Sequence, residues 1–283
     1  MPVTEFTEFN LYKGKCKVKF YPNSHRYIVN GKPTSGSVTG ILGMYDKSGA
    51  LLPWAVELSV NFLRDKFIKG EKFTEEDFFD AEEQHTIKKK QAADIGTLVH
   101  DWIEKHILGE KPPMPEIREA QIGVNAFLEW ITDNKVKFIS TERAIYSRKH
   151  DYIGKMDIEA KVNGKLTLID IKTSNGIYNT YNMQTAAYVM ADQEESGKKY
   201  HGRWIIRLAK ESEKEYDTRM AKKNFNRKRK GKEPVDYPPY QVFEAKFLDE
   251  TAGNLERDFA AFLACKTLFA YEKATGFYAS FKN

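Results

Sequence analysis

One stretch, residues 151–174, constrains the fold of this chain more than any other. It contains two runs rich in β-branched residues, and Asn163-Gly164 lies between them. Asn-Gly is the strongest short-range signal for a two-residue turn in a β-hairpin. We therefore expect a hairpin whose two strands are Met156–Val162 and Lys165–Thr173.

The predicted turn places two acidic side chains on one face of the hairpin. Asp157 would lie opposite Asp170, with Cβ atoms about 4.5–5.5 Å apart, where like charges repel. A bound cation would convert this repulsion into coordination. Lys172 would point to the same face, whereas Ile169 and Ile171 would point to the other face, towards a core. The alternative is an ordinary exposed hairpin face, and a β-bulge would shift the register by one residue.

Length and composition are typical of one large domain. The chain has 283 residues, of which 41% are hydrophobic, enough for a substantial core. No apolar run approaches the roughly 18–20 residues that span a bilayer, and the N-terminus resembles neither a signal peptide nor a transit peptide. Cys16 and Cys265 match no disulfide or metal framework. We expect a cytoplasmic protein with reduced thiols and no membrane partner.

A strongly basic segment lies in the C-terminal third of the chain. Between residues 219 and 232 there are no acidic residues and eight basic ones: Arg219, Lys222, Lys223, Arg227, Lys228, Arg229, Lys230 and Lys232. This local charge exceeds the net charge of the whole chain, +5, so the remainder is mildly acidic. Such a patch suits a phosphate backbone. A solvated, disordered loop has the same composition, and the two interpretations are compatible.

Hydrophobic periodicity, turn residues and capping signals predict the individual elements. Apart from the central hairpin, the expected strands are Lys17–Tyr21, Arg26–Val29, Lys137–Tyr146, His201–Leu208 and Tyr240–Phe247. The expected helices are Leu52–Ile68, one beginning at Thr74, Gln91–Leu108, Glu116–Asn134, Asn179–Ala191 and Glu250–Thr275. Ser37 is expected to be the N-cap of a further helical turn.

The order of these elements indicates the fold class. Helices precede three strands, which are followed by a helix, two strands and a final helix. This order predicts an α/β fold with a mixed central β-sheet flanked by helices and an N-terminal helical portion. The chain has no glycine-rich phosphate loop, nucleophile elbow or HExxH motif. NTPases, Rossmann enzymes, hydrolases with a nucleophile elbow and zinc proteases are therefore disfavoured.

The predicted helix at residues 91–108 carries a histidine at the border of its apolar face. At about 100° per residue, one stripe contains Ile95, Val99, Trp102, Ile103 and Ile107. His100 lies at the margin of this stripe, and Glu104 follows one turn later on the same side. A histidine in that position can face a cleft. The alternative is a half-buried histidine paired with the glutamate at i, i+4.

Four short motifs follow one another in a recognisable order and spacing. They are GTLVH (Gly96–His100), GKMD (Gly154–Asp157), DIKT (Asp170–Thr173) and Gln184-x-x-x-Tyr188. With these motifs the sequence resembles the RecB-like branch of the PD-(D/E)xK nuclease superfamily. The early segment SVTGIL also resembles mitochondrial genome maintenance exonucleases and related phage nucleases. The resemblance implies a single nuclease domain with a restriction-endonuclease-like core.

This resemblance divides the domain, residues 1–283, into four regions. Residues 1–90 would form an N-terminal hairpin and helical elaboration, and residues 91–210 the catalytic core. Residues 211–239 would form a basic loop, and residues 240–283 a closing strand and helix. Related nucleases bind an iron–sulfur cluster through four cysteines, but this chain has only two. The resemblance is therefore to the cluster-free exonucleases.

The resemblance also implies a set of metal ligands. His100, Asp157 and Asp170 would bind a divalent cation, with the Ile171 carbonyl as an additional ligand. Carboxylate and carbonyl oxygens suit Mg²⁺, and one imidazole makes Mn²⁺ a suitable substitute. Such a cation polarises a phosphate and lowers the pKa of a bound water.

Further residues would assist the reaction. Lys172 would orient the attacking water or neutralise charge in the transition state. Gln184 and Tyr188 would hold the nucleophile, Lys172 or the DNA backbone; the alternative is that both are ordinary helix-surface residues. Glu104 and Glu142 are second-tier candidates for a metal-bound water or a second metal.

The implied substrate is DNA, and the resemblance favours single-stranded DNA. The residues expected to contact it are Ser37, Thr39, Thr173, Lys222, Lys223, Arg227, Lys228, Arg229 and Lys230. Tyr178 and Tyr181 could stack on bases, and the N-terminal helices could form an arch over a threaded strand. The implied role is in DNA replication, recombination or repair, in a bacterial or phage-infected cell. A helicase, recombinase or single-strand-binding protein would act as a separate chain.

Two other functions remain open on the sequence. The first is a structure-specific or restriction-type endonuclease built on the same core. The second is a nucleic-acid-binding protein in which the nuclease fold is catalytically silent.

Overall fold

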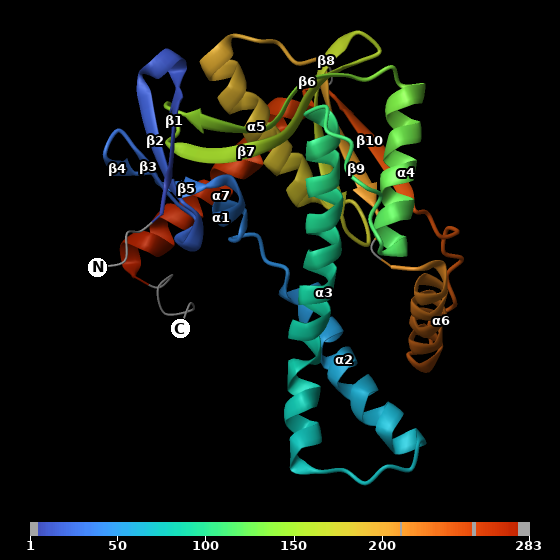
Figure 1. Ribbon diagram of the computed structural model, residues 1–283. Coiled ribbons are helices and arrows are strands. Elements are labelled where there is room, and N and C mark those ends of the chain that lie inside the picture. The colour runs from blue at the N-terminus through green and yellow to red at the C-terminus, as the bar shows by residue number, and fades with distance from the viewer. Residues whose placement is uncertain (1–4, 210, 251–252, 277–283) are drawn as a thin grey trace.

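A mixed six-stranded sheet organises the computed structural model, which describes residues 5–209, 211–250 and 253–276. The strands lie in the order β10-β9-β8-β7-β5, and β6 also pairs with β7 (Figure 1). Their bounds are β5 (Gly36–Ser37), β6 (Lys137–Ser147), β7 (Tyr152–Val162), β8 (Lys165–Thr173), β9 (Gly202–Leu208) and β10 (Phe243–Asp249). Pairing is parallel for β5–β7 and β8–β9 and antiparallel elsewhere. The predicted α/β fold with a mixed central sheet is confirmed.

A second, antiparallel sheet lies at the N-terminal end of the chain. It contains β1 (Thr7–Leu11), β2 (Cys16–Tyr21), β3 (Arg26–Val29) and β4 (Lys32–Pro33), with short 3₁₀ turns at Tyr12–Gly14 and Pro22–Ser24. The predicted strands at β2 and β3 are confirmed, whereas β1 was missed. Only one of its five residues is buried, so it lacks the regular apolar alternation that marks a half-buried strand.

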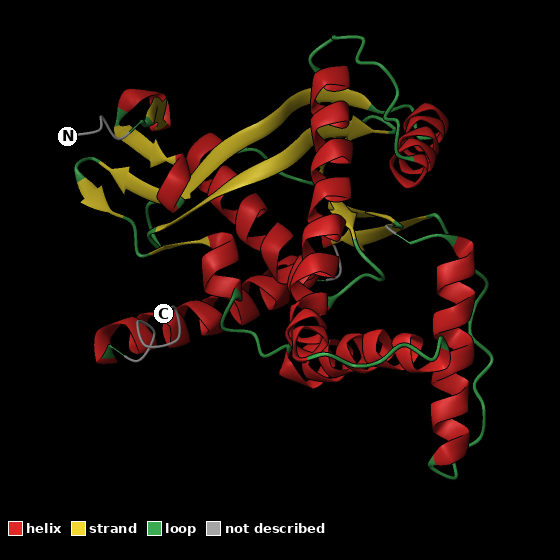
Figure 2. Cartoon of the chain, turned by 60° about the horizontal axis from the view of Figure 1, so that its bottom comes forward, coloured by secondary structure: helices red, strands yellow, loops and turns green. Residues whose placement is uncertain are grey.

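Helices cover both faces of the central sheet (Figure 2). Their bounds are α1 (Val38–Leu42), α2 (Ser48–Ile68), α3 (Glu75–Ile107), α4 (Arg118–Asp133), α5 (Asn179–Ser196), α6 (Glu213–Arg229) and α7 (Asn254–Thr275). Helices α1, α5 and α7 bury one face in a core that includes Met156 and Leu168. The C-terminal half of α3 and all of α4 bury the other face, which includes Ile169 and Ile171 as predicted. None of the described helices is long and apolar enough to cross a membrane.

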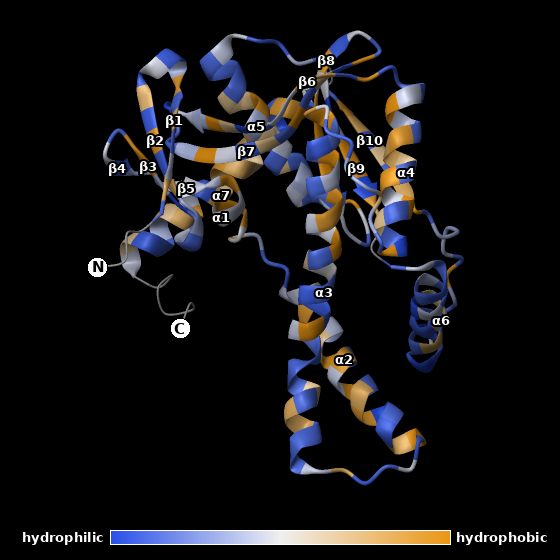
Figure 3. Ribbon diagram, in the orientation of Figure 1, coloured by the Kyte–Doolittle hydropathy of each residue, from blue (hydrophilic) through white to orange (hydrophobic). Residues whose placement is uncertain are grey.

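Helix α2 and the N-terminal half of α3 project away from the sheet as a two-helix arm (Figure 1). The prediction of two helices at residues 74–108 is wrong, since α3 is continuous. Thr74 and Asp77 form the predicted capping box at its start, and the 33 residues that follow contain no proline. Figure 3 shows hydrophobic residues along the arm, and several of them are exposed, among them Leu52, Phe67 and Phe79.

The segment predicted as a basic loop at residues 211–239 contains helix α6. Ser212 and Glu215 form a capping box at its start, with the Glu215 carboxylate accepting hydrogen bonds from the Ser212 N–H and hydroxyl groups. Lysine and arginine are good helix formers, so a basic composition alone did not distinguish loop from helix. The closing helix begins at Asn254 instead of Glu250. The predicted helix included residues 251–252 and the predicted domain residues 1–4 and 277–283, which lie outside the described residues.

Arg203 on β9 is a buried cation that joins the sheet to two helices. Its guanidinium lies 2.5 Å from a Glu250 carboxylate oxygen and 2.8 Å from an Asp258 oxygen on α7. It also donates to the Asn182 carbonyl on α5 at 2.7 Å. This network fixes α5 and α7 against the central sheet.

We predict that Arg203→Met destabilises the protein by about 3–5 kcal/mol, because it leaves carboxylates buried without their cation. Urea unfolding followed by circular dichroism measures this change. Lys19→Met is the control, since its ion pair with Glu8 is exposed and such pairs contribute about 0–1 kcal/mol. Equal effects of the two substitutions would contradict the assigned role of Arg203.

Candidate metal centre

The central hairpin has the predicted register but its pairing ends early. Val162 pairs with Lys165, and Ile158 pairs with Ile169, as the Asn-Gly turn predicts. The ladder stops before Asp157 and Asp170, which were expected to be the next pair. Instead, the Asp157 carboxylate accepts a hydrogen bond from the Ile171 N–H at 2.9 Å. The two strands separate at the position where the acidic side chains lie.

Glu142 on β6 has a backbone conformation that is unusual for a strand. Its φ is +51°, in the left-handed region, and the ladder pairs Thr141 with Ile158 and Arg143 with Met156 but omits Glu142. A non-glycine residue in this region costs on the order of 1–3 kcal/mol, and such residues cluster at functional sites. The irregular backbone brings the Glu142 carboxylate to Asp157.

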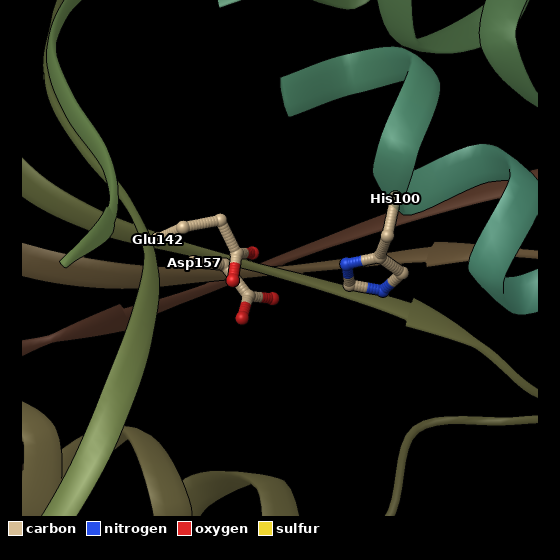
Figure 4. A group of neighbouring side chains, drawn as sticks. All are labelled: His100, Glu142 and Asp157. Carbon is tan, nitrogen blue, oxygen red and sulfur yellow. The ribbon is translucent and has the colours of Figure 1, made fainter. Parts of the chain in front are cut away.

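Three side chains from three elements come together here (Figure 4). One ligand atom each of His100 on α3, Glu142 on β6 and Asp157 on β7 lies within 4.8 Å of the other two. The two carboxylates lie next to each other and face the imidazole ring. The structure thus brings together the predicted ligands His100 and Asp157. It adds Glu142, which was only a second-tier candidate, in place of Asp170.

Asp170 lies behind this group as a fully buried carboxylate. One of its oxygens is 2.5 Å from the Lys172 ammonium in an ion pair, but neither oxygen accepts a hydrogen bond within the described residues. Burial, assisted by the charge of Asp157, raises the pKa of Asp170 to about 7 even though Lys172 opposes the shift. A nearby divalent cation would favour the charged carboxylate. The residues present therefore fit a cation such as Mg²⁺ or Mn²⁺.

Two lysines contact these carboxylates. Burial alone would lower the pKa of Lys172, but Asp170 and Asp157 outweigh it and the pKa is raised, so the ammonium stays charged. Lys155, inside the GKMD motif, forms an ion pair with Glu142. Burial raises the pKa of Glu142, Lys155 opposes the shift, and Asp157 adds to it. The group is thus partly neutralised by the protein's own cations.

Gly96 lets α3 approach the sheet closely enough for His100 to reach the site. A Cβ atom on Gly96 would lie 2.6 Å from the Thr173 hydroxyl oxygen on β8. His100 follows one helical turn later and faces the same way. The glycine of the GTLVH motif therefore has a packing role that sets the position of the histidine.

Gln184 and Tyr188 on α5 hydrogen-bond to each other at 2.8 Å. Tyr188 is buried, so the alternative of an ordinary helix-surface residue is wrong for it. A Cβ atom on Gly154 would lie 2.7 Å from the Tyr188 ring. The pair packs α5 against β7 beside Asp157, and its contact with a nucleophile stays a prediction.

A cleft of about 1720 Å³ extends from this centre between the arm, α3 and α6. Of the predicted residues, it is lined by His100, Glu104, Glu142, Asp157, Thr173, Tyr178, Tyr181, Lys222 and Lys223. Ser37 is the N-cap of α1, accepting from the Gly40 N–H at 3.1 Å, and Thr39 lies in the same turn. Neither lines the cleft, nor do Arg227, Lys228, Arg229 and Lys230. Their roles in DNA binding stay predictions.

Sequence reasoning missed other residues of this cleft. Lys88 and Lys89 on α3 and Trp54 on α2 line it. The lysine run was visible in the sequence, but two separate helices were expected there. Because α3 is one continuous helix, Lys88 and Lys89 line the same cleft as His100. The sequence did not indicate this continuity.

Comparisons with known proteins found matches among solved structures and none at the level of sequence. No family model matches the sequence, and no curated protein is similar to it. Among solved structures, the chain is similar to an alkaline exonuclease (LHK-Exo) from Laribacter hongkongensis and to LHK-Exo in complex with dAMP. In both cases identity is 12%, the match covers 67% of this chain and 92% of the other, and the TM-score is 0.29. So low a TM-score carries no argument about function.

We predict that Glu142→Gln weakens Mn²⁺ binding at least tenfold, because it removes a charged oxygen ligand. Isothermal titration calorimetry measures the affinity. Glu119→Gln serves as the matched control, since Glu119 lines the same cleft outside the three-residue group. Similar Mn²⁺ affinities of the two variants would show that Glu142 is not a ligand.

We predict that Gly96→Ala costs about 1–3 kcal/mol of stability through overpacking against Thr173. It should also weaken Mn²⁺ binding, because α3 must move and carries His100 with it. Gly49→Ala in α2 is the control, as no atom lies within 4 Å of its added Cβ, and alanine is the better helix former. Thermal unfolding and Mn²⁺ titration test both variants. A Gly96→Ala protein as stable as wild type would contradict the close approach.

Proposed function

We propose that this protein is a divalent-metal-dependent DNA exonuclease that hydrolyses phosphodiester bonds in single-stranded DNA. The observation that carries the proposal is the grouping of His100, Glu142 and Asp157 at one end of a cleft. The ion pair between the fully buried Asp170 and Lys172 adds to it. His100, Asp157, Asp170 and Lys172 belong to the sequence motifs that resemble RecB-like nucleases, whereas Glu142 lies outside these motifs.

The three grouped side chains would hold Mg²⁺ or Mn²⁺. When bound, the cation would polarise the scissile phosphate and lower the pKa of a water, which would then attack phosphorus as hydroxide. The Ile171 N–H group fixes the orientation of the Asp157 carboxylate. The irregular strand backbone fixes the position of Glu142, whose carboxylate would bind the cation in place of the Lys155 ammonium.

Lys172 would act on the reacting phosphate. The oxygen of the attacking water bonds to phosphorus, the bond to the leaving sugar oxygen breaks, and that oxygen takes up a proton. Negative charge accumulates on the phosphate in the transition state, and a fixed ammonium stabilises it. Asp170 holds Lys172 in position through their 2.5 Å contact.

Aromatic side chains along the cleft favour a single strand as substrate. Tyr178 and Tyr181 line the cleft in edge-to-face contact, with ring centroids 5.5 Å apart, and 51% of Tyr178 is exposed. Unpaired bases can stack on exposed aromatic rings, whereas bases inside a duplex cannot. We further propose a role in DNA replication, recombination or repair, which the sequence resemblance supports.

We predict that the protein degrades end-labelled linear single-stranded DNA with Mg²⁺ or Mn²⁺ and not with EDTA. Lys172→Ala should lower the rate by about 10²–10³-fold, the usual effect of removing one group that stabilises developing charge. Lys165→Ala is the control because Lys165 lies on the same strand, exposed. The rates are measured on denaturing gels.

The same assay separates the other functions. Cleavage of circular single-stranded DNA would identify an endonuclease. Binding without cleavage under every metal condition would identify a nucleic-acid-binding protein. Cleavage that survives EDTA or the loss of Lys172 would contradict the proposed site.

A further inference from the structure

The cleft that begins at the candidate metal centre continues along α3. His100 lies at one end, and Lys89, Lys88 and His85 line the other end, in the arm. Twelve residues separate His100 from Lys88, which corresponds to about 18 Å at a rise of 1.5 Å per residue. The cleft is therefore longer than the reaction centre itself requires.

The charge of the cleft changes sign along its length. Near the candidate metal centre, four carboxylates outnumber one cation, Lys155: Asp101, Glu104, Glu142 and Asp157. At the far end, five cations outnumber the carboxylates of Glu57, Glu211 and Glu215: Lys88, Lys89, Arg219, Lys222 and Lys223. The two ends thus suit different ligands, a divalent cation at one and an anion at the other.

Ion pairs already occupy two of the far-end cations. Lys222 lies 2.6 Å from a Glu57 oxygen on α2, and Arg219 is paired with Glu211. Within the described residues, Lys88, Lys89 and Lys223 form no ion pair. These three ammonium groups are the ones available to an incoming anion.

The surroundings of Lys223 favour an anionic ligand. Burial, followed by repulsion from Arg219, lowers its pKa, so an anion beside it would relieve an unfavourable charge. Glu211 and Glu57 oppose this shift, but Glu211 is paired with Arg219 and Glu57 with Lys222. Glu215 interacts favourably with the charge of Lys88, but the Glu215 carboxylate accepts its hydrogen bonds from Ser212 in the capping box, at 2.9 and 3.0 Å.

The far end also has an apolar wall. Trp54, Leu51 and Leu52 of α2 line it, and 37% of Trp54 and 65% of Leu52 are exposed. A groove that combines ammonium groups with exposed aromatic and apolar side chains matches a single strand, which presents phosphates and unpaired bases together. A duplex exposes phosphates and base edges but keeps the faces of its bases stacked inside.

We propose that Lys88, Lys89 and Lys223 form a phosphate-binding subsite for the backbone of a single-stranded nucleic acid, remote from the metal centre. The proposal rests on the proposed function. At a spacing of 3.4 Å per nucleotide in one strand, about 18 Å corresponds to about five nucleotides, and fewer if the strand is stretched. The subsite would thus hold a strand several nucleotides from the scissile bond.

Two lysines between α2 and α3 provide a matched control. Lys69 and Lys72 are exposed and do not line the cleft. The Lys69→Glu/Lys72→Glu double variant changes the net charge by the same amount as Lys88→Glu/Lys89→Glu.

The experiment measures binding of a thymidine dodecamer and a thymidine trimer by fluorescence anisotropy in EDTA, where no metal-dependent cleavage occurs. We expect Lys88→Glu/Lys89→Glu to weaken dodecamer binding at least tenfold and to leave trimer binding unchanged. The slope of log K against log salt should fall by about 1.4, which is about 0.7 for each phosphate that the variant no longer neutralises. Lys223→Glu, on the opposite wall, should weaken dodecamer binding independently, and the control pair should change it less than about twofold.

Other outcomes overturn the subsite. Equal loss of dodecamer binding in the α3 pair and the control pair would mean that only net charge matters. Equal loss for dodecamer and trimer would place the lysines at the reaction centre. If wild type degrades linear DNA with Mn²⁺ but the α3 pair binds like wild type, only this inference fails. If wild type neither binds nor degrades DNA with any metal, the proposed function fails with it.

Discussion

Crowding of carboxylates at the end of the central hairpin is the constraint on which the site depends. Asp170 is fully buried and neither of its oxygens accepts a hydrogen bond within the described residues, while Asp157 and Glu142 lie close by. Burying charges of one sign is costly unless cations offset them. Lys172 and Lys155 offset part of the charge. A divalent cation beside the His100 imidazole would offset the negative charge that the two lysines leave uncompensated.

Close packing of helices on the sheet fixes the positions of the side chains in the site. Helix α3 can bring His100 to the sheet because Gly96 leaves room for Thr173. Helix α5 can pack beside Asp157 because Gly154 leaves room for Tyr188. Arg203 ties α5 and α7 to β9 from within the core. Interiors are packed densely enough that an added methyl group at either glycine would shift the helices.

The arm and α6 extend the cleft beyond the candidate metal centre. Helix α3 covers the sheet and forms one wall of the cleft, so His100 and the distant lysines belong to one continuous helix. The contact of Lys222 with Glu57 and Asn61 joins α6 to the arm. At that end of the cleft, exposed apolar side chains lie with ammonium groups that form no ion pair within the described residues.

Local signals in the sequence were sufficient for the hairpin, its register and most element types. An Asn-Gly turn and strict alternation determine which side chains share a face, and both depend only on neighbouring residues. The order of motifs likewise predicted His100, Asp157, Asp170 and Lys172 together. Tertiary structure alone decided the left-handed backbone of Glu142, the early separation of β7 and β8, and the alignment of Lys88 with the cleft. These features depend on contacts between residues far apart in the chain, whose energies no local pattern contains.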